Sequence, residues 1–224
     1  ESDAITNQIV RLIDYLKCIP VDLLQVDKVE ADDVIGYITK RLPKNGTIMS
    51  SDRDYLQLIN EKVDVYSPTK KKFYTTKTVI DEYACSPTNF LIHKILLGDK
   101  GDNVPGVNKL GEKTLIKLYP ELKDDYPITL DEVLDKAKSS QGKHFENIRN
   151  FEHQLRINQL LMDLHNANIP MDGQLIIQNV LENPTKTFEP KEFMRMYDED
   201  KLEGSIKNVN YWLHNHFLQL SKYK

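Results

Sequence analysis

Seven carboxylates in three short clusters are the side chains of this chain that are best suited to chemistry. The clusters are Glu30-x-Asp32-Asp33, Asp52-x-Asp54 and Asp99-x-x-Asp102. The second cluster follows an apolar run at residues 47–49, which we predict to be a short buried strand. Ligands collect at such strand ends in open α/β sheets. Carboxylates that fold together raise one another's pKa unless a cation is present, and hard oxygen ligands suit Mg²⁺ or Mn²⁺. The pattern therefore predicts a divalent-metal site.

A purely structural interpretation of the same acids is open. Asp32, Asp33 and Asp54 each precede or begin an expected helix. Acids at that position are common as helix caps and as favourable partners of the helix dipole. Capping does not require three separate acidic patterns in one chain, so we favour the metal hypothesis for the clusters taken together.

Hydrophobic periodicity predicts the elements that position these acids. We expect helices at residues 4–18 and 31–41, strands at 21–26, 47–49 and 63–66, a turn at 43–46, a helical turn at 55–59, and a pairing of residues 73–74 with the 63–66 strand. From residue 78 onward the pattern is helical, at 87–97, 112–119, 130–137, 145–162 and 175–181, and no strand is expected within 78–165. A final apolar stripe at 206–220 is expected to be core. The alternation in the first half indicates an α/β fold with a mostly parallel sheet.

Composition narrows the class of protein. The chain has 224 residues, 40% of them hydrophobic, so a packed core is expected. A net charge of −4 argues against a generally basic nucleic-acid binder, although acids that hold metal account for part of it. No apolar run approaches the ~20 residues that span a bilayer, and no signal peptide is recognised. The two cysteines, Cys18 and Cys85, are isolated, which fits a reducing compartment.

A glycine-containing turn at residues 104–111 lies between two expected helices. Lys100, Lys109, Lys113 and Lys117 surround it. Exposed backbone N–H groups and lysines bind phosphates without reading sequence. This turn is therefore a candidate grip on a nucleic-acid backbone, and the alternative is a simple helix–turn–helix connection with solvated lysines.

Three motifs together resemble a known family. They are VEADDVIG at residues 29–36, SDRDYLQL at 51–58, and GDKGDNVPGV at 98–107 followed by LGEKT at 110–114. In this order and spacing they closely resemble the 5′-nuclease family, which includes flap endonucleases, the 5′-nuclease domain of bacterial DNA polymerase I and phage 5′→3′ exonucleases. The resemblance covers about residues 5–120. The tail resembles, more weakly, the phage branch that includes the T-even phage RNase H.

The resemblance implies a PIN-like α/β core in which carboxylates hold two divalent metals. The acids that match the family's metal ligands are Glu30, Asp32, Asp33, Asp52, Asp54, Asp99 and Asp102. We expect Asp32, Asp52 and Asp54 to be catalytic, with Asp32 and Asp52 as direct ligands and Asp33 and Asp54 acting through water. The family's helix-hairpin-helix, which grips duplex DNA and often holds K⁺, matches residues 104–114. The residues expected to bind DNA are Lys100, Gly106, Val107, Lys109, Gly111, Lys113 and Thr114.

The resemblance also implies an organisation and a set of partners. Residues 1–97 are expected to be the C-terminal part of the PIN-like core, residues 98–165 the helix-hairpin-helix region, and residues 166–224 a helical C-terminal region. The family's N-terminal strands and basic arch are not recognised in this sequence. We expect that this part either was lost or left out, or is supplied by another chain. Expected partners are 5′-ended or flap duplex DNA, RNA–DNA hybrid and single-stranded DNA-binding protein. We expect no membrane, a monomer, and the cytoplasm of a bacterial or phage-infected cell.

Two other functions remain open at this stage. One is a DNA-binding module of the same family without catalysis. The other is a metal-dependent phosphatase, which also uses a D-x-D pattern. The hairpin argues against the phosphatase, because an enzyme acting on small molecules has no use for a grip on a duplex.

Overall fold

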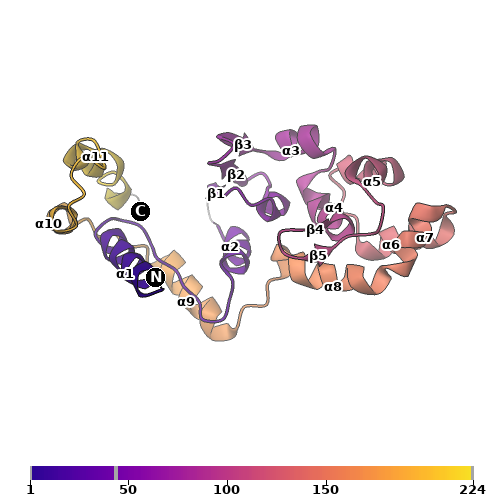
Figure 1. Ribbon diagram of the computed structural model, residues 1–224, viewed down its shortest axis with the longest axis horizontal. Coiled ribbons are helices and arrows are strands. Elements are labelled where there is room, and N and C mark those ends of the chain that lie inside the picture. Colours follow the sequence, from indigo (N-terminus) through magenta and orange to yellow (C-terminus); the bar gives the residue numbers. More distant parts are fainter. Residues whose placement is uncertain (1, 43–44, 223–224) are drawn as a thin grey trace. The chain divides into compact units, whose positions relative to one another are not determined.

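The computed structural model describes residues 2–42 and 45–222 and divides the chain into two units. The central unit is Val29–Ile169, and the terminal unit combines Glu1–Lys28 with Pro170–Lys224. The predicted turn at residues 43–46 begins outside the described residues. The two units are taken separately below (Figure 1).

A small mixed sheet begins the central unit. Its strands are β1 (Gly46–Met49), β2 (Val63–Ser67) and β3 (Lys72–Tyr74). β1 pairs with β2 in parallel, and β2 pairs with β3 antiparallel. The side chains of β2 alternate between buried and half-buried, as the period of two requires. The expected α/β class and the pairing of residues 73–74 with β2 are confirmed, whereas only one of the two strand pairs is parallel.

Two strand predictions were wrong in part. Residues 21–26 form no strand but an irregular connection before the next helix. A short β-branched or apolar run becomes a strand only where a neighbouring strand offers hydrogen bonds, and none of the described residues pairs with it. β1 does form, but it is not buried. It is an edge strand of this sheet among the described residues, and Met49 is 73% exposed.

Helices make up the rest of the central unit. They are α2 (Ala31–Thr39), α3 (Thr76–Tyr83), α4 (Phe90–Leu97), α5 (Glu112–Leu118), α6 (Leu130–Ser139), α7 (Lys143–Asn150) and α8 (Glu152–Met162), with 3₁₀ turns at Asp54–Leu58, Pro87–Asn89, Pro120–Lys123 and Leu164–Asn166. The helix expected at 145–162 is interrupted at Phe151 and becomes α7 and α8. Two-residue strands, β4 (Gly98–Asp99) and β5 (Val104–Pro105), pair antiparallel where no strand was expected.

One hydrophobic core holds the central unit together. α4 packs against α8, and the side chains of Ile95 and Leu96 on α4 are fully buried. The same core continues through the 3₁₀ turn at Asp54–Leu58 and into α6. α4 therefore lies at the centre of this unit, and its polar residues are held in fixed positions.

The terminal unit joins the two ends of the chain. It contains α1 (Ser2–Lys17), α9 (Met171–Glu182), α10 (Pro190–Glu199), α11 (Val209–His216) and a 3₁₀ turn at Leu220–Lys222. Its core consists of Cys18, Ile19, Phe193, Met196, Tyr197 and Leu213. The predicted core stripe near the C-terminus is confirmed at Leu213, whereas Leu220 is 44% exposed.

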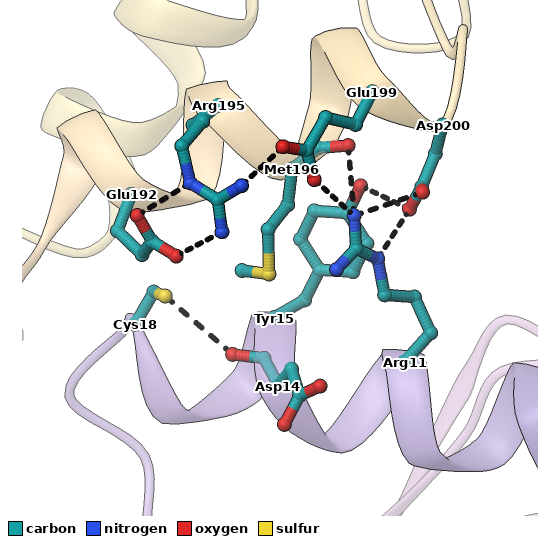
Figure 2. Close-up of polar contacts among 9 residues, drawn as sticks. All are labelled: Arg11, Asp14, Tyr15, Cys18, Glu192, Arg195, Met196, Glu199 and Asp200. Atoms are coloured by element: carbon teal, nitrogen blue, oxygen red, sulfur yellow. Dashed lines mark hydrogen bonds and ion pairs between the residues drawn. The ribbon is translucent and has the colours of Figure 1, made fainter.

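Polar contacts fasten α1 to α10 (Figure 2). Arg11 donates to both carboxylate oxygens of Asp200 at 2.8 and 2.9 Å and to Glu199 at 3.0 Å. The hydroxyl of Tyr15 donates to Asp200 at 2.7 Å. Beside this network the rings of Tyr15 and Phe193 pack with centroids 4.8 Å apart. The fork of an arginine fits a carboxylate closely, so these contacts fix the register of the two helices.

Candidate active site

A buried lysine connects two of the three acidic clusters. Lys94 lies on α4 and is 7% exposed. Its ammonium contacts Asp54 Oδ1 and donates a hydrogen bond to Asp99 Oδ2 at 2.8 Å. The hydrogen bond from Lys94 lowers the pKa of Asp99. The D-x-D loop and the loop after α4 therefore meet at one positive charge.

Backbone packing sets the position of Asp99. The backbone of Gly98, with a φ of +71°, lies against Val104 and Gly106, and a Cβ added at Gly106 would lie 2.0 Å from the carbonyl oxygen of Leu97. Both positions therefore require glycine. The carboxylate of Asp99 also accepts a hydrogen bond from the N–H of Gly101 at 2.7 Å, which orients it toward Lys94.

Buried polar side chains hold the D-x-D loop. The N–H of Asp54 donates to Asp52 Oδ1 at 2.9 Å. Just after these acids, the amide of Gln57 donates to the carbonyl of Met162 at 3.0 Å and accepts from the N–H of Leu164 at 3.1 Å. Gln57 is 2% exposed, so both hydrogen bonds are shielded from water. They attach the loop to the end of α8.

The first acidic cluster opens α2. Glu30 is the N-cap residue but makes no capping hydrogen bond with its side chain. Burial raises the pKa of Asp33, and the charges of Asp32 and Glu30 raise it further. Burial also raises the pKa of Tyr55 to about 12, with added contributions from the charges of Asp32 and Asp52. Tyr55 therefore lies within electrostatic reach of both the first and the second cluster.

The acids do not form a complete metal shell in this structure. Within residues 2–42 and 45–222, no group of three or more His, Cys, Asp or Glu side chains is arranged to hold a metal ion. Asp54 and Asp99 meet through Lys94. The charges of Asp32 and Asp52 both raise the pKa of Tyr55. Asp102 is exposed. The donor set nevertheless fits a hard divalent cation, since it consists of carboxylates. Burial raises the pKa of Asp33 most, and the charges of Asp32 and Glu30 add to it; a bound cation would offset that repulsion.

The predicted DNA-binding residues divide into two groups. Lys100, Lys109 and Lys113 are exposed, and none of the three has an ion-pair partner in the described part of the chain. Gly111 is exposed, whereas Thr114 and Gly106 are half-buried. Val107 belongs to the core, and its N–H donates to the carbonyl of Leu96 at 2.9 Å. Val107 therefore shapes the hairpin, and the three lysines provide its free charge.

Sequence reasoning missed Lys94 and Asn158. Lys94 interrupts the apolar helix FLIHKILL, and a charged residue in such a helix signals a buried ion pair. Asn158 on α8 is fully buried and donates to the carbonyls of Ile95 and Pro105 at 3.0 and 2.8 Å, which ties α4 to the hairpin. No sequence signal distinguishes this asparagine from others in a helix, because its role depends on contacts between distant segments.

Comparisons with known proteins show which family of proteins the chain is similar to. A family model described as the 5′-3′ exonuclease N-terminal resolvase-like domain matches residues 1–84. A 5′-3′ exonuclease of Buchnera aphidicola from Acyrthosiphon pisum is 30% identical over 175 residues, which are 76% of this chain and 59% of that protein. The chain is similar to members of the 5′-nuclease family. A 5′-3′ exonuclease of Aquifex aeolicus, 36% identical over 119 residues, is matched across 52% of this chain and 41% of its own length. The chain thus spans about half the length of these curated relatives.

Solved structures of the family agree with the fold. A mutant of bacteriophage T5 5′-exonuclease has a TM-score of 0.61 and 25% identity, covering 70% of this chain and 67% of its own. The T5 flap endonuclease, solved in a complex with DNA and metal ions, also has a TM-score of 0.61 and covers 70% of this chain and 60% of its own. These neighbours support the PIN-like interpretation and the likeness to phage members. No helix in the described ranges is long and apolar enough to cross a membrane.

Proposed function

We propose that this chain contributes the acidic site and the duplex grip of a structure-specific 5′ nuclease. Such an enzyme hydrolyses phosphodiester bonds at the 5′ ends or flaps of DNA, or of RNA–DNA hybrids, in replication, primer removal or repair. The observation that carries the proposal is the ion-paired group Asp54–Lys94–Asp99, which lies at the base of a hairpin bearing unpaired lysines. The names of the relatives point to the same reaction.

Metal ions have a defined place in this proposal. Mg²⁺ or Mn²⁺, with two ions per site, supplies activation of water and stabilisation of the leaving oxygen when bound. Asp32 and Asp52 would hold the ions directly, because each begins or follows a rigid element. Asp33 and Asp54 would act through water, and Glu30, Asp99 and Asp102 would complete the acidic set. T5 5′-exonuclease has been crystallised with metal ions, which supports a metal requirement here.

The chain's own residues would orient the substrate. Lys94 keeps Asp54 and Asp99 at a fixed separation, so the acids need not reorganise when a charged phosphate arrives. Lys100, Lys109 and Lys113 would contact duplex phosphates, and these contacts carry no sequence information. We further propose that the backbone of the hairpin holds K⁺. We also propose that the protein is a monomer and acts in the cytoplasm of a bacterial or phage-infected cell. Single-stranded DNA-binding protein is its proposed protein partner.

A DNA-binding module without catalysis is the second candidate. It is favoured by one observation, that the described residues contain no group of three acids arranged for a metal. The two candidates differ in the fate of the substrate, since both bind a duplex but only the nuclease cuts it.

One substitution tests the nuclease. Asp52→Asn removes a ligand charge without removing a phosphate contact, so it should abolish Mg²⁺-dependent cleavage of a 5′-flap duplex and leave binding unchanged or slightly tighter. Cleavage is followed on a labelled flap, and binding by anisotropy with Ca²⁺ in place of Mg²⁺. Full cleavage by the Asn variant would refute the metal-site assignment. Binding without cleavage by the unmodified chain would favour the non-catalytic module.

A further inference from the structure

A pocket lies beside Asp99 on the side of α4 that faces α5. Its volume is about 470 Å³, within the range of small-molecule sites. Apart from Lys94 and the loop residues near Asp99, it is lined chiefly by Arg53, Tyr83, Phe90, His93, Lys100 and Glu112. Five of these six residues were not predicted to be functional, so most of this lining is new, although the pocket adjoins the third acidic cluster at Asp99.

Aromatic rings form the inner wall of the pocket. The rings of Phe90 and His93 stack with centroids 5.3 Å apart and an interplanar angle of 19°. The ring of Tyr83 meets the ring of Phe90 edge-on at 5.2 Å and that of His93 at 6.2 Å. All three residues are buried. A rigid wall of this kind favours a flat ligand with π faces and edges.

The pocket contains a buried polar side chain without a hydrogen-bond partner. His93 is 5% exposed, and neither of its ring nitrogens makes a hydrogen bond within the described ranges. Its Nε2 lies 3.5 Å from Glu112 Oε1, and no hydrogen bond joins the two atoms. Buried polar groups are nearly always paired, so this ring is suited to a ligand that offers both a donor and an acceptor.

Two unpaired cations line the same pocket. Neither the guanidinium of Arg53 nor the ammonium of Lys100 has an ion-pair or hydrogen-bond partner in the described part of the chain. The third cation of the lining, Lys94, is already held by Asp54 and Asp99. The lining therefore combines an aromatic wall, an unsatisfied imidazole and two free positive charges.

We propose that this pocket binds one unpaired nucleotide. Its base would lie against the Phe90–His93–Tyr83 wall with an edge on the imidazole of His93, and its phosphate would meet Arg53 and Lys100. The inference rests on the proposed function for the source of the nucleotide, either the end of a bound strand or a free nucleoside monophosphate. A sugar phosphate would leave the aromatic wall unused, and a neutral apolar ligand would leave the two cations unused.

Two measurements on the full chain test the proposal and separate the two sources. The first compares Kd, with Ca²⁺, for a 5′-flap duplex and for duplexes with an abasic residue on either side of the junction. If a strand end fills the pocket, one abasic substitution should weaken binding about 5- to 140-fold, which corresponds to the free energy of stacking one base on an aromatic side chain. The second titrates dAMP, with ribose 5-phosphate and inorganic phosphate as controls, by calorimetry.

The variants His93→Phe and Arg53→Ala carry the test. His93→Phe keeps the stacked ring and removes both nitrogens, and Arg53→Ala removes an exposed charge that the fold does not need. Each should remove most of the abasic effect or of the dAMP binding. Lys123→Ala, an exposed lysine outside this pocket, is the matched control and should change neither. Circular dichroism verifies folding, and Arg53→Ala decides the matter if His93→Phe does not fold.

Every outcome bears on the proposal. An abasic effect without dAMP binding assigns the pocket to a strand end, and dAMP binding that exceeds both controls without an abasic effect assigns it to free nucleotide. Absence of both overturns the proposal, as does an effect that both variants retain. Failure of the proposed function alone would appear as dAMP binding by a chain that neither binds nor cuts the flap duplex.

Discussion

Lys94 shows how one side chain organises two acidic loops. Its ammonium lies where Asp54 and Asp99 meet, and the residue is only 7% exposed. Two carboxylates so close together would repel each other without it. The lysine therefore supplies a fixed positive charge to a site that is otherwise strongly acidic.

Replacing Lys94 should reveal this repulsion. Lys94→Met keeps the buried stem and removes the charge, so it should lower the free energy of unfolding by about 2 kcal/mol, less than for a fully buried pair because Asp99 is partly exposed. Urea unfolding in EDTA measures the loss, and Mg²⁺ should recover part of it. Lys100→Met, at an exposed lysine without an ion-pair partner among the described residues, should change stability by less than about 0.5 kcal/mol. Equal stability of the two variants would contradict the role given to Lys94.

Glu82 connects stability to pH. Burial alone would raise its pKa, but hydrogen bonds from Lys72, Lys70 and Tyr74 outweigh burial and lower the pKa from 4.5 to about 2. Because the folded state lowers this pKa, the stabilisation is complete above pH 4.5 and is lost as the pH falls from 4.5 toward 2. Glu82→Gln should therefore lower the free energy of unfolding by about 1 kcal/mol at pH 7, a value suited to a partly exposed pair. It should also weaken the fall of that free energy between pH 4.5 and pH 2. Urea unfolding across this pH range measures both effects. Asp81→Asn, at a neighbouring acid without an ion-pair partner among the described residues, should leave this pH dependence unchanged.

The residue types of the acidic clusters could be read from the sequence, but their partners could not. The spacing of Asp52 and Asp54 indicated a loop after a strand, and the structure has such a loop. The pairing of Asp54 with Lys94 depends on how α4 packs, which no local pattern encodes. The same holds for His93, which looks like any polar residue in a helix until its neighbours are known.

β4 and β5 approach each other so closely that only glycine fits at positions 98 and 106. Gly98 and Gly106 bring two backbone segments into direct contact, and Asp99 follows immediately. The sequence indicated a turn rich in glycine but no strand, because two-residue strands have no period to detect. The mixed sheet and the capping boxes of α3 and α6 follow local patterns more closely.

A methyl group at position 106 should disrupt the close pairing of β4 and β5. Gly106→Ala places a Cβ 2.0 Å from the carbonyl oxygen of Leu97, so it should lower the free energy of unfolding by about 1–3 kcal/mol and weaken cleavage by displacing Asp99. Gly111→Ala is the matched control in the same hairpin. A Cβ at Gly111 meets no atom within 4 Å, and its φ of −97° is open to any residue. Equal effects of the two substitutions on unfolding would show that close packing does not position the hairpin.

At the scale of the whole molecule, the sequence of the central unit is inserted between the two segments that form the terminal unit. Among the described residues, the buried core of the central unit extends from Tyr55 to Leu164, with Ile35 and Ile48 packed against it. The terminal unit takes helices from both ends of the sequence. The sequence indicated amphipathic helices at both ends. It did not indicate that α1 packs on α10, because an apolar stripe specifies burial but not a partner.

The central unit should therefore fold by itself. A fragment of residues 29–169 should keep helical circular dichroism and unfold in one cooperative transition, because the described residues of its buried core all lie within this range. A fragment of residues 170–222 should unfold without a clear transition, because its core loses Cys18 and Ile19. Thermal and urea melts of both fragments test this. A non-cooperative melt of the 29–169 fragment would show that the two units depend on each other.

The meeting of α1 with α10 also has a consequence for synthesis on the ribosome. α1 emerges before the central unit, and its partner emerges after it. Tyr15 and Leu16 of α1, which pack against the core of the terminal unit, must therefore remain without these partners while the whole of Val29–Ile169 is translated. That takes on the order of ten seconds at common elongation rates. During that interval the nascent chain is exposed to chaperones and proteases. The terminal unit should therefore become resistant to proteolysis later than the central unit, even though α1 is translated before it.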